Sequence, residues 1–260
     1  MASNFEIDQP INSPNNSITQ AFPGFKTNSF TFAASLIQFI FYLISLILSE
    51  SLIEPSFCSL YNLGANYVPS IIEDKQFYRL FTAIFLHGSA MHLLVIFIQI
   101  NIFAQLRLGF TIEKYYGLKK YIFIYILSGI GGNLLGGFIR PTDITVGAST
   151  SLFGVFGCYG CYFVYNWNTL GPGRNLNLVL YLFFVLISLE LPITLQSIDI
   201  GGHIGGFIVG ILLGFFLLPR EENSDTWNYV LIINGMALLG YFAFMIWSWS
   251  QLEITDRFTC

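Results

Sequence analysis

The chain has 260 residues, of which 54% are hydrophobic, 17% aromatic and only 10% charged. About a quarter of the residues in a soluble domain are charged, so this composition, with a mean hydropathy of +0.65, indicates an integral membrane protein. The formal net charge of −4 is thinly spread and argues against a nucleic-acid partner. The four cysteines are too few and too scattered to predict a disulfide framework.

The N-terminal 28 residues are rich in Asn, Ser, Pro and Gln, which is typical of a disordered segment. They contain no basic stretch followed by an apolar core, so we predict no cleaved signal peptide. We expect residues 1–28 to form a disordered cytosolic tail and 29–219 to form a core of six spans. Residues 220–260 would form a linker, a seventh span and a short C-terminal tail.

The apolar segments predict an all-α, polytopic membrane protein with a six-helix core and a seventh C-terminal transmembrane helix. This prediction follows from the length of about 20 mostly apolar residues that a helix needs to cross a bilayer. The segments that meet it are 30–49, 87–106, 120–138, 149–166, 176–194, 202–218 and 228–249.

Basic residues predict the orientation, because Lys and Arg gather on the cytosolic side of membrane proteins. With seven spans, seven of the 11 basic residues would lie on the side of the N-terminus and four on the other side. The N-terminus is therefore predicted to be cytosolic. Glycosylation of the sequon Asn15-Asn16-Ser17 would reverse this orientation.

Polar side chains stand at the starts of three expected spans. The three histidines, His87, His92 and His203, lie there, and so does Ser149. Because the second, fourth and sixth spans begin on the same non-cytosolic side, these groups would enter the membrane from one face. A serine beside a histidine is the minimal arrangement for nucleophilic catalysis, although a serine in a membrane helix more often bonds its own backbone or joins helices.

The sixth expected span, GGHIGGFIVGILLG, carries a glycine at every fourth position. Such a stripe lets another helix approach closely, and the fourth expected span is also rich in small residues. We therefore expect these two helices to pack backbone to backbone and to bring Ser149 and His203 within hydrogen-bonding reach. The glycines of the stripe are Gly202, Gly206, Gly210 and Gly214.

Three motifs combine at wide spacing: GAS at 147–149, HIGG at 203–206, and the two-histidine stretch QFYRLFTAIFLHGSAMHLL. With them the chain resembles the rhomboid family of intramembrane serine proteases over about residues 60–214. The resemblance implies a six-helix core with a Ser-His dyad. The seventh span resembles the six-plus-one arrangement of the eukaryotic secretase-type members, whose N-terminus faces the cytosol.

The resemblance also implies roles for individual residues. Ser149 would be the nucleophile and His203 the general base, and the oxyanion would be held by the backbone N–H of Ser149 and the side chain of His92. The family pattern requires no acidic third member, and the sequence supplies no obvious one. No cofactor and no metal are expected. The supporting residues would be Gly147, Phe153, His87 and Gly206.

One position fits the family pattern of an active protease and another departs from it. Phe153, one turn after Ser149, matches the aromatic position that stacks on the base in relatives, although core filling explains it equally well. The family places an asparagine four residues after its second histidine, where this chain has Ile96. Asn101 would fit only if about five residues are inserted, and loss of an oxyanion donor costs about 100-fold in turnover.

We interpret the chain as a protease that cleaves transmembrane helices of single-span membrane proteins in the lipid bilayer. It would be a multi-pass protein of the secretory pathway or plasma membrane. The alternative is a catalytically weak or inactive rhomboid-like protein that binds membrane clients. A zinc protease is disfavoured because H-E-x-x-H is absent, and a transporter or channel rests only on the number of spans.

Overall fold

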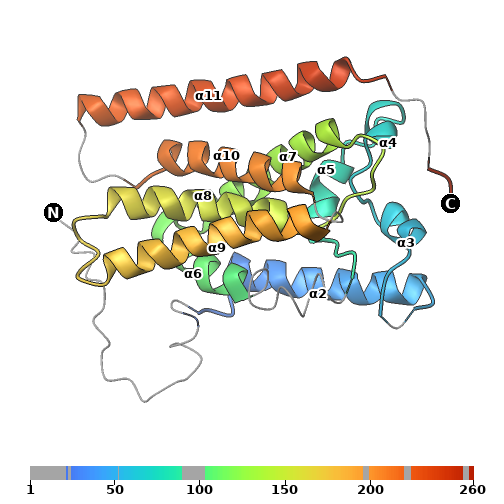
Figure 1. The fold of residues 1–260 in the computed structure, drawn as a ribbon, viewed down its shortest axis with the longest axis horizontal. Helices are drawn as coiled ribbons and strands as arrows, with labels where there is room; N and C mark the ends of the chain where they lie inside the picture. The colour runs from blue at the N-terminus through green and yellow to red at the C-terminus, as the bar shows by residue number, and fades with distance from the viewer. Residues whose placement is uncertain are drawn as a thin grey trace.

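The computed structural model describes residue 22 and residues 25–51, 53–89, 103–195, 199–219, 224–253 and 258–260. These residues form helices that lie roughly along one direction, with short helices gathered at one end (Figure 1). The all-α prediction is confirmed for this part of the chain, where the β structure is one isolated bridge. The longer helices are α2 (Phe30–Leu48), α6 (Phe103–Tyr116), α7 (Leu118–Ile139), α8 (Ser149–Tyr165), α9 (Arg174–Leu195), α10 (Ile200–Phe216) and α11 (Asp225–Ser250).

Six of the expected spans match these helices to within three residues at each end. Of the described helices, α2, α7 and α11 are long and apolar enough to cross a membrane, and two shorter apolar helices cover Arg174–Leu186 and Ile200–Phe216. An integral membrane protein is the conclusion, and the number of seven crossings stays a prediction.

The second expected span, 87–106, is wrong in its bounds. Residues 86–89 are not helical, and α6 continues to Tyr116. The charged residues after position 106 suggested an end to the span, but the structure gives Glu113 a partner. Its carboxylate accepts hydrogen bonds from the backbone N–H groups of Phe30 (2.8 Å) and Thr31 (2.9 Å) and from the Thr31 hydroxyl (2.7 Å). Glu113 thus satisfies orphan donors at the start of α2 and is itself accommodated.

The segment between α2 and position 87 folds into short helices around one arginine. Arg79 is buried, and its guanidinium donates to the carbonyls of Tyr61 (2.7 Å) and Ala65 (3.1 Å) and lies 4.2 Å from the centre of the Tyr61 ring. These bonds hold the turns of this first loop together. Its helices are α3 (Phe57–Asn62), α4 (Val68–Ile72), α5 (Arg79–Thr82) and the 3-10 helix η1 (Ala83–Phe85).

Helix α10 is packed closely against both α7 and α8, and glycines make this possible. A Cβ at Gly205 would stand 3.0 Å from the carbonyl oxygen of Gly131 in α7. On the other side, a Cβ at Gly206 or Gly210 would collide with the backbone of Thr150 or Gly154 in α8. The predicted backbone-to-backbone packing of the fourth and sixth spans is therefore confirmed.

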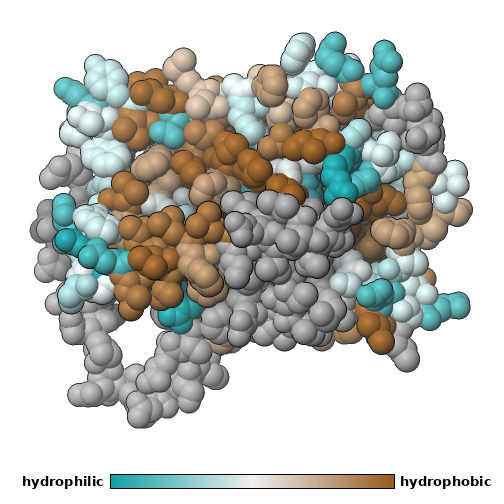
Figure 2. Space-filling model, in the orientation of Figure 1, coloured by the Kyte–Doolittle hydropathy of each residue, from teal (hydrophilic) through white to brown (hydrophobic). Residues whose placement is uncertain are grey.

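Helix α11 lies along the outside of the bundle (Figure 1). It is held near α7 by Tyr241, whose hydroxyl donates to the Gly131 carbonyl (2.8 Å), and by Trp249, whose indole N–H donates to the Leu134 carbonyl (2.8 Å). Much of its surface is apolar and exposed, as is that of α9. Figure 2 shows this apolar surface along the bundle, with hydrophilic residues mostly toward its two ends, as suits a protein surrounded by lipid.

Candidate active site

Ser149 is the first residue of α8, and the turn before it requires glycine. Gly147 has a φ of 144°, which L side chains rarely adopt. Its N–H donates to the carbonyl of Ala83 (3.0 Å), which ties the turn to η1 in the first loop. The glycine singled out in the sequence therefore lets the chain enter α8 at a fixed angle.

A second contact joins the segment before Ser149 to the first loop. Asn66 and Thr145 form the isolated antiparallel bridge, with N–H to carbonyl distances of 2.9 and 3.0 Å. The Asn66 amide also donates to the Thr145 hydroxyl (3.2 Å) and to the carbonyl of Asn133 in α7 (3.1 Å). The position of Ser149 is thus set by the first loop and α7 together.

His203 lies in the first turn of α10 and faces α8. Its imidazole stacks on the ring of Phe153, with 4.2 Å between ring centroids and 15° between ring planes. Phe153 follows Ser149 by four residues in α8, so the two side chains share one helix face. The histidine ring and Ser149 therefore lie on the same side of α8, about one turn apart.

Close approach of the two backbones supports this arrangement. Gly206 lies against the backbone of Thr150, and Gly202 lies where a Cβ would be 2.8 Å from a Thr150 methyl carbon. Larger side chains at these two positions would push α10 away from the start of α8. Gly206, predicted as a supporting residue, therefore contacts the residue next to Ser149.

The site is almost closed to solvent in this state. Ser149 is 8% exposed, His203 3% and Phe153 2%. Polar groups in such surroundings interact more strongly than they would in water, and a substrate must displace part of this packing to reach His203.

The start of α8 offers hydrogen-bond donors. The N-cap residue is Ala148, which has no side chain able to accept from the first-turn N–H groups. Uncapped N–H groups at a helix N-terminus favour negative charge. The N–H groups near Ser149 can therefore stabilise an anion at the beginning of α8.

The sequence analysis missed one acidic residue at this site. Asp199 is the N-cap of α10, four residues before His203, and its carboxylate accepts a hydrogen bond from the Gly202 N–H (2.8 Å). The same carboxylate fills the space beside Gly136 of α7, where any Cβ would collide with it. An aspartate immediately before an apolar helix is a recognised N-cap signal, so the sequence did contain the information.

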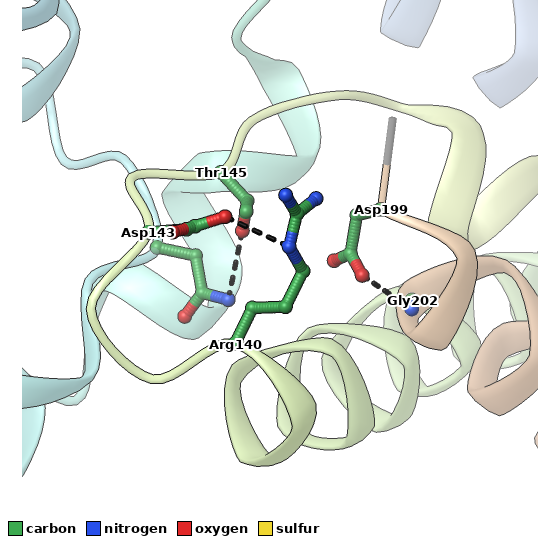
Figure 3. Close-up of polar contacts among 6 residues, drawn as sticks. Arg140, Asp143, Thr145, Asp199 and Gly202 are labelled. Atoms are coloured by element: carbon green, nitrogen blue, oxygen red, sulfur yellow. Dashed lines mark hydrogen bonds and ion pairs between the residues drawn. The ribbon is translucent and has the colours of Figure 1, made fainter. Parts of the chain in front are cut away.

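Arg140 and Asp143 form the polar surroundings of Asp199. Figure 3 shows the Arg140 guanidinium between the two carboxylates, and its Nε lies 2.9 Å from Asp143 Oδ2. Burial raises the pKa of the Asp199 carboxyl above its ordinary value, and Asp143 adds to this rise. The Gly202 N–H and the charge of Arg140 act in the opposite direction and only partly offset it.

Of the remaining candidate residues, one is described by the structure and the others are not. His87 is buried, 1% exposed, just after η1 and outside any helix, so it belongs to the wall of the first loop. His92, Ile96 and Asn101 lie outside the described residues, and their predicted roles in the oxyanion site stay predictions. Among the described residues, His, Cys, Asp and Glu form no group of three or more that could hold a metal ion.

Comparison with known proteins identifies the family. The model of the Rhomboid domain matches residues 74–220, which include α6 to α10 and with them Ser149, Phe153, Asp199 and His203. The chain belongs to the rhomboid family. The α7, α8 and α10 packing is thus the central part of a rhomboid domain.

Curated relatives extend over more of the chain. Rhomboid-like protease 1 of Toxoplasma gondii is 35% identical over 210 residues, covering 79% of this chain and 69% of the relative. Rhomboid-like protease 3 of the same organism is 30% identical over 217 residues, or 84% and 80%. RHOMBOID-like protein 2 of Arabidopsis thaliana is 37% identical over 171 residues, or 66% and 52%. The first two are named as proteases, so this rhomboid belongs to a family of intramembrane proteases.

Proposed function

We propose that this rhomboid is a serine protease that cleaves transmembrane helices, with Ser149 as nucleophile and His203 as general base. The observation that carries the proposal is the stacking of His203 on Phe153, one turn from Ser149 on the same face of α8. Close glycine contacts between α8 and α10 bring the two helices near enough for short side chains to meet.

In this mechanism His203 takes the proton of the Ser149 hydroxyl as its oxygen attacks the scissile carbonyl carbon. The carbonyl oxygen becomes negatively charged in the tetrahedral intermediate, and the N–H groups at the start of α8 stabilise that charge, with His92 as the proposed second donor. His203 then gives the proton to the leaving amine. A water molecule hydrolyses the acyl-enzyme by the same two steps, with His203 again as base and then as acid.

Asp199 supports this site by fixing the first turn of α10. Its carboxylate caps the helix at Gly202, and its carbonyl accepts the N–H of His203 (3.1 Å). A capped first turn holds the backbone of His203 in place while Phe153 holds its ring. The two contacts act on different parts of the same residue.

The substrate class follows from the family and from the surface. We propose that single-span membrane proteins are cleaved, and that the substrate helix enters from the lipid and unwinds locally, because a peptide bond inside an intact helix is already hydrogen-bonded. The basic-residue distribution supports a cytosolic N-terminus, with the site on the opposite side, in the secretory pathway or the plasma membrane.

One observation favours a second function. Ile96 replaces the asparagine that the rhomboid pattern places after its second histidine, so a side-chain donor is absent from that position. A rhomboid with a weakened oxyanion site would bind membrane clients without cutting them at a useful rate. Retention of both Ser149 and His203 supports the protease instead.

Labelling with a fluorophosphonate tests the proposal, because the reagent reacts with an activated serine. We expect an adduct on Ser149 in the wild-type protein, and no adduct in Ser149→Ala or His203→Ala. The matched control is Ser151→Ala, a fully buried serine two residues away, which should still be labelled. A folded wild-type protein that is not labelled and does not cleave a co-expressed single-span protein would favour the client-binding function.

A further inference from the structure

Residues 258–260, which follow α11 in the chain, lie against the first loop. The backbone N–H of Phe258 donates to the Tyr67 hydroxyl (2.6 Å). The Phe258 ring lies 5.7 Å from the Tyr61 ring centre and 6.4 Å from that of Tyr67. Residues 258–260 are therefore docked on the surface formed by α3 and the start of α4.

This docking brings two cysteines together. Cys58 is in α3, three residues before Tyr61, so both side chains lie on one face of the helix. Cys260 follows Phe258 by two residues, and Phe258 lies against Tyr61, one turn of α3 from Cys58. The two thiols are near enough for Cys58 to influence the pKa of Cys260. Cys58 is half-buried and Cys260 exposed, so small thiol reagents can reach the pair.

The other two cysteines have a different environment. Cys158 and Cys161 are buried in α8, and their thiols donate to the carbonyls of Gly210 (3.1 Å) and Ile211 (3.4 Å) in α10. They belong to the packing between these helices. Only the pair at positions 58 and 260 combines proximity with access among the described residues.

We propose that Cys58 and Cys260 form a reversible disulfide that fastens the segment after α11 to α3. This modification joins residues that follow α11 to the first loop, which also holds the turn before Ser149. It does not depend on the protease assignment, since it rests on the contacts of the docked segment alone.

The oxidant would be a disulfide of low molecular mass, such as oxidised glutathione. The thiolate of Cys58 attacks one sulfur of the reagent, so its disulfide bond breaks, one glutathione thiolate leaves and a mixed disulfide forms. The thiolate of Cys260 then attacks the Cys58 sulfur and releases the second glutathione thiolate. Two protein thiols are oxidised, one disulfide is reduced, and the two cysteine protons pass to the two released thiolates.

The surroundings of Cys260 also affect the rate at which the disulfide closes. Desolvation and the adjacent Cys58 thiol raise the pKa of Cys260 to about 11. Cys260 is therefore mostly a neutral thiol near pH 7, and ring closure should accelerate as the pH rises toward that value, because the thiolate is the nucleophile. With the N-terminus in the cytosol and seven spans, the pair would lie on the non-cytosolic side, where disulfides persist.

The test uses the full chain in detergent micelles, reduced and then equilibrated in mixtures of reduced and oxidised glutathione. After remaining thiols are blocked with a maleimide, mass spectrometry should find a monomer that carries two fewer maleimide groups than the fully reduced protein, with linked peptides that contain positions 58 and 260. Cys58→Ser and Cys260→Ser should lose this species and carry a glutathione adduct on the remaining partner. Cys161→Ser should form it like the wild type.

A further variant tests the docking itself. Phe258→Ala removes the ring that packs on Tyr61 and Tyr67, so the ratio of bridged to reduced protein should fall about tenfold in the same buffer, because the effective concentration of one thiol at the other decreases. Two separate glutathione adducts on wild-type protein, a bridge between two chains, or an unchanged ratio in Phe258→Ala would each overturn the proposal. Loss of protease activity would leave it standing.

Discussion

The imidazole of His203 lies parallel to the ring of Phe153, 4.2 Å away, although the two residues come from different helices. An aromatic ring in this position limits rotation of the histidine about its side-chain bonds. The proposed base is thereby held on the face of α8 that carries Ser149, one turn earlier.

Replacing Phe153 with alanine should therefore reduce turnover more than stability alone explains. We expect kcat/KM for a single-span substrate to fall about tenfold, which corresponds to a ring contact worth about 1.4 kcal/mol. Phe153→Tyr keeps the ring and should keep most of the rate. Phe163→Leu, a buried position further along α8, should change the unfolding temperature but not kcat/KM, and an equal loss of rate in this variant would contradict the role of Phe153.

The contact between Gly206 and the Thr150 backbone predicts a strong effect of one methyl group. Gly206→Ala should separate α8 from α10 and lower the free energy of unfolding by about 1–3 kcal/mol. Gly240→Ala in α11 is the matched control, because a Cβ there meets nothing within 4 Å, and it should be neutral or stabilise by about 0.5–1 kcal/mol. Thermal unfolding in detergent measures both, and equal melting temperatures for the two variants would refute the packing argument.

The raised pKa of Asp199 predicts a pH dependence of stability. Because the folded protein binds this proton more tightly than the unfolded chain, stability should fall as the pH rises from the unfolded pKa of about 3.8 to the higher folded pKa, and then stay level. Asp199→Asn should remove this slope. Arg140→Gln should steepen it, because Arg140 lowers the pKa.

Unfolding free energies at about pH 4 and pH 7 measure this effect as a difference between variants. The wild type should lose more stability than Asp199→Asn between the two values. Parallel profiles for wild type and Asp199→Asn would show that the Asp199 proton is not coupled to folding.

Glu113 should contribute to stability through the start of α2. Glu113→Gln leaves one acceptor oxygen where two now serve three donors, so the free energy of unfolding should decrease by about 1–3 kcal/mol. Lys114→Gln changes the charge of an exposed neighbour and serves as control. Chemical unfolding compares the two, and a larger loss in Lys114→Gln would mean that net charge rather than capping matters.

Hydropathy and glycine spacing predicted most helices and the approach of α8 to α10, because both depend on patterns within a single segment. The predicted end of the second span was wrong because hydropathy treats Glu113 as unfavourable in a helix, whereas its hydrogen bonds to Phe30 and Thr31 depend on another helix. Asp199 was overlooked although its position before α10 marks an N-cap. The placement of Cys260 beside Cys58 depends on how the last described residues dock on the first loop, which no local pattern records.

The pairing of Asn66 with Thr145 also constrains how the molecule is assembled. The long helices α6 and α7 lie between these residues along the chain, so the turn that carries Ser149 takes its final shape only after both have been inserted. His203 is synthesised later still. If Ser149 and His203 act as proposed, a growing rhomboid chain is therefore unable to cut its neighbours at the translocation site, because these two residues come together only after α10 has been made.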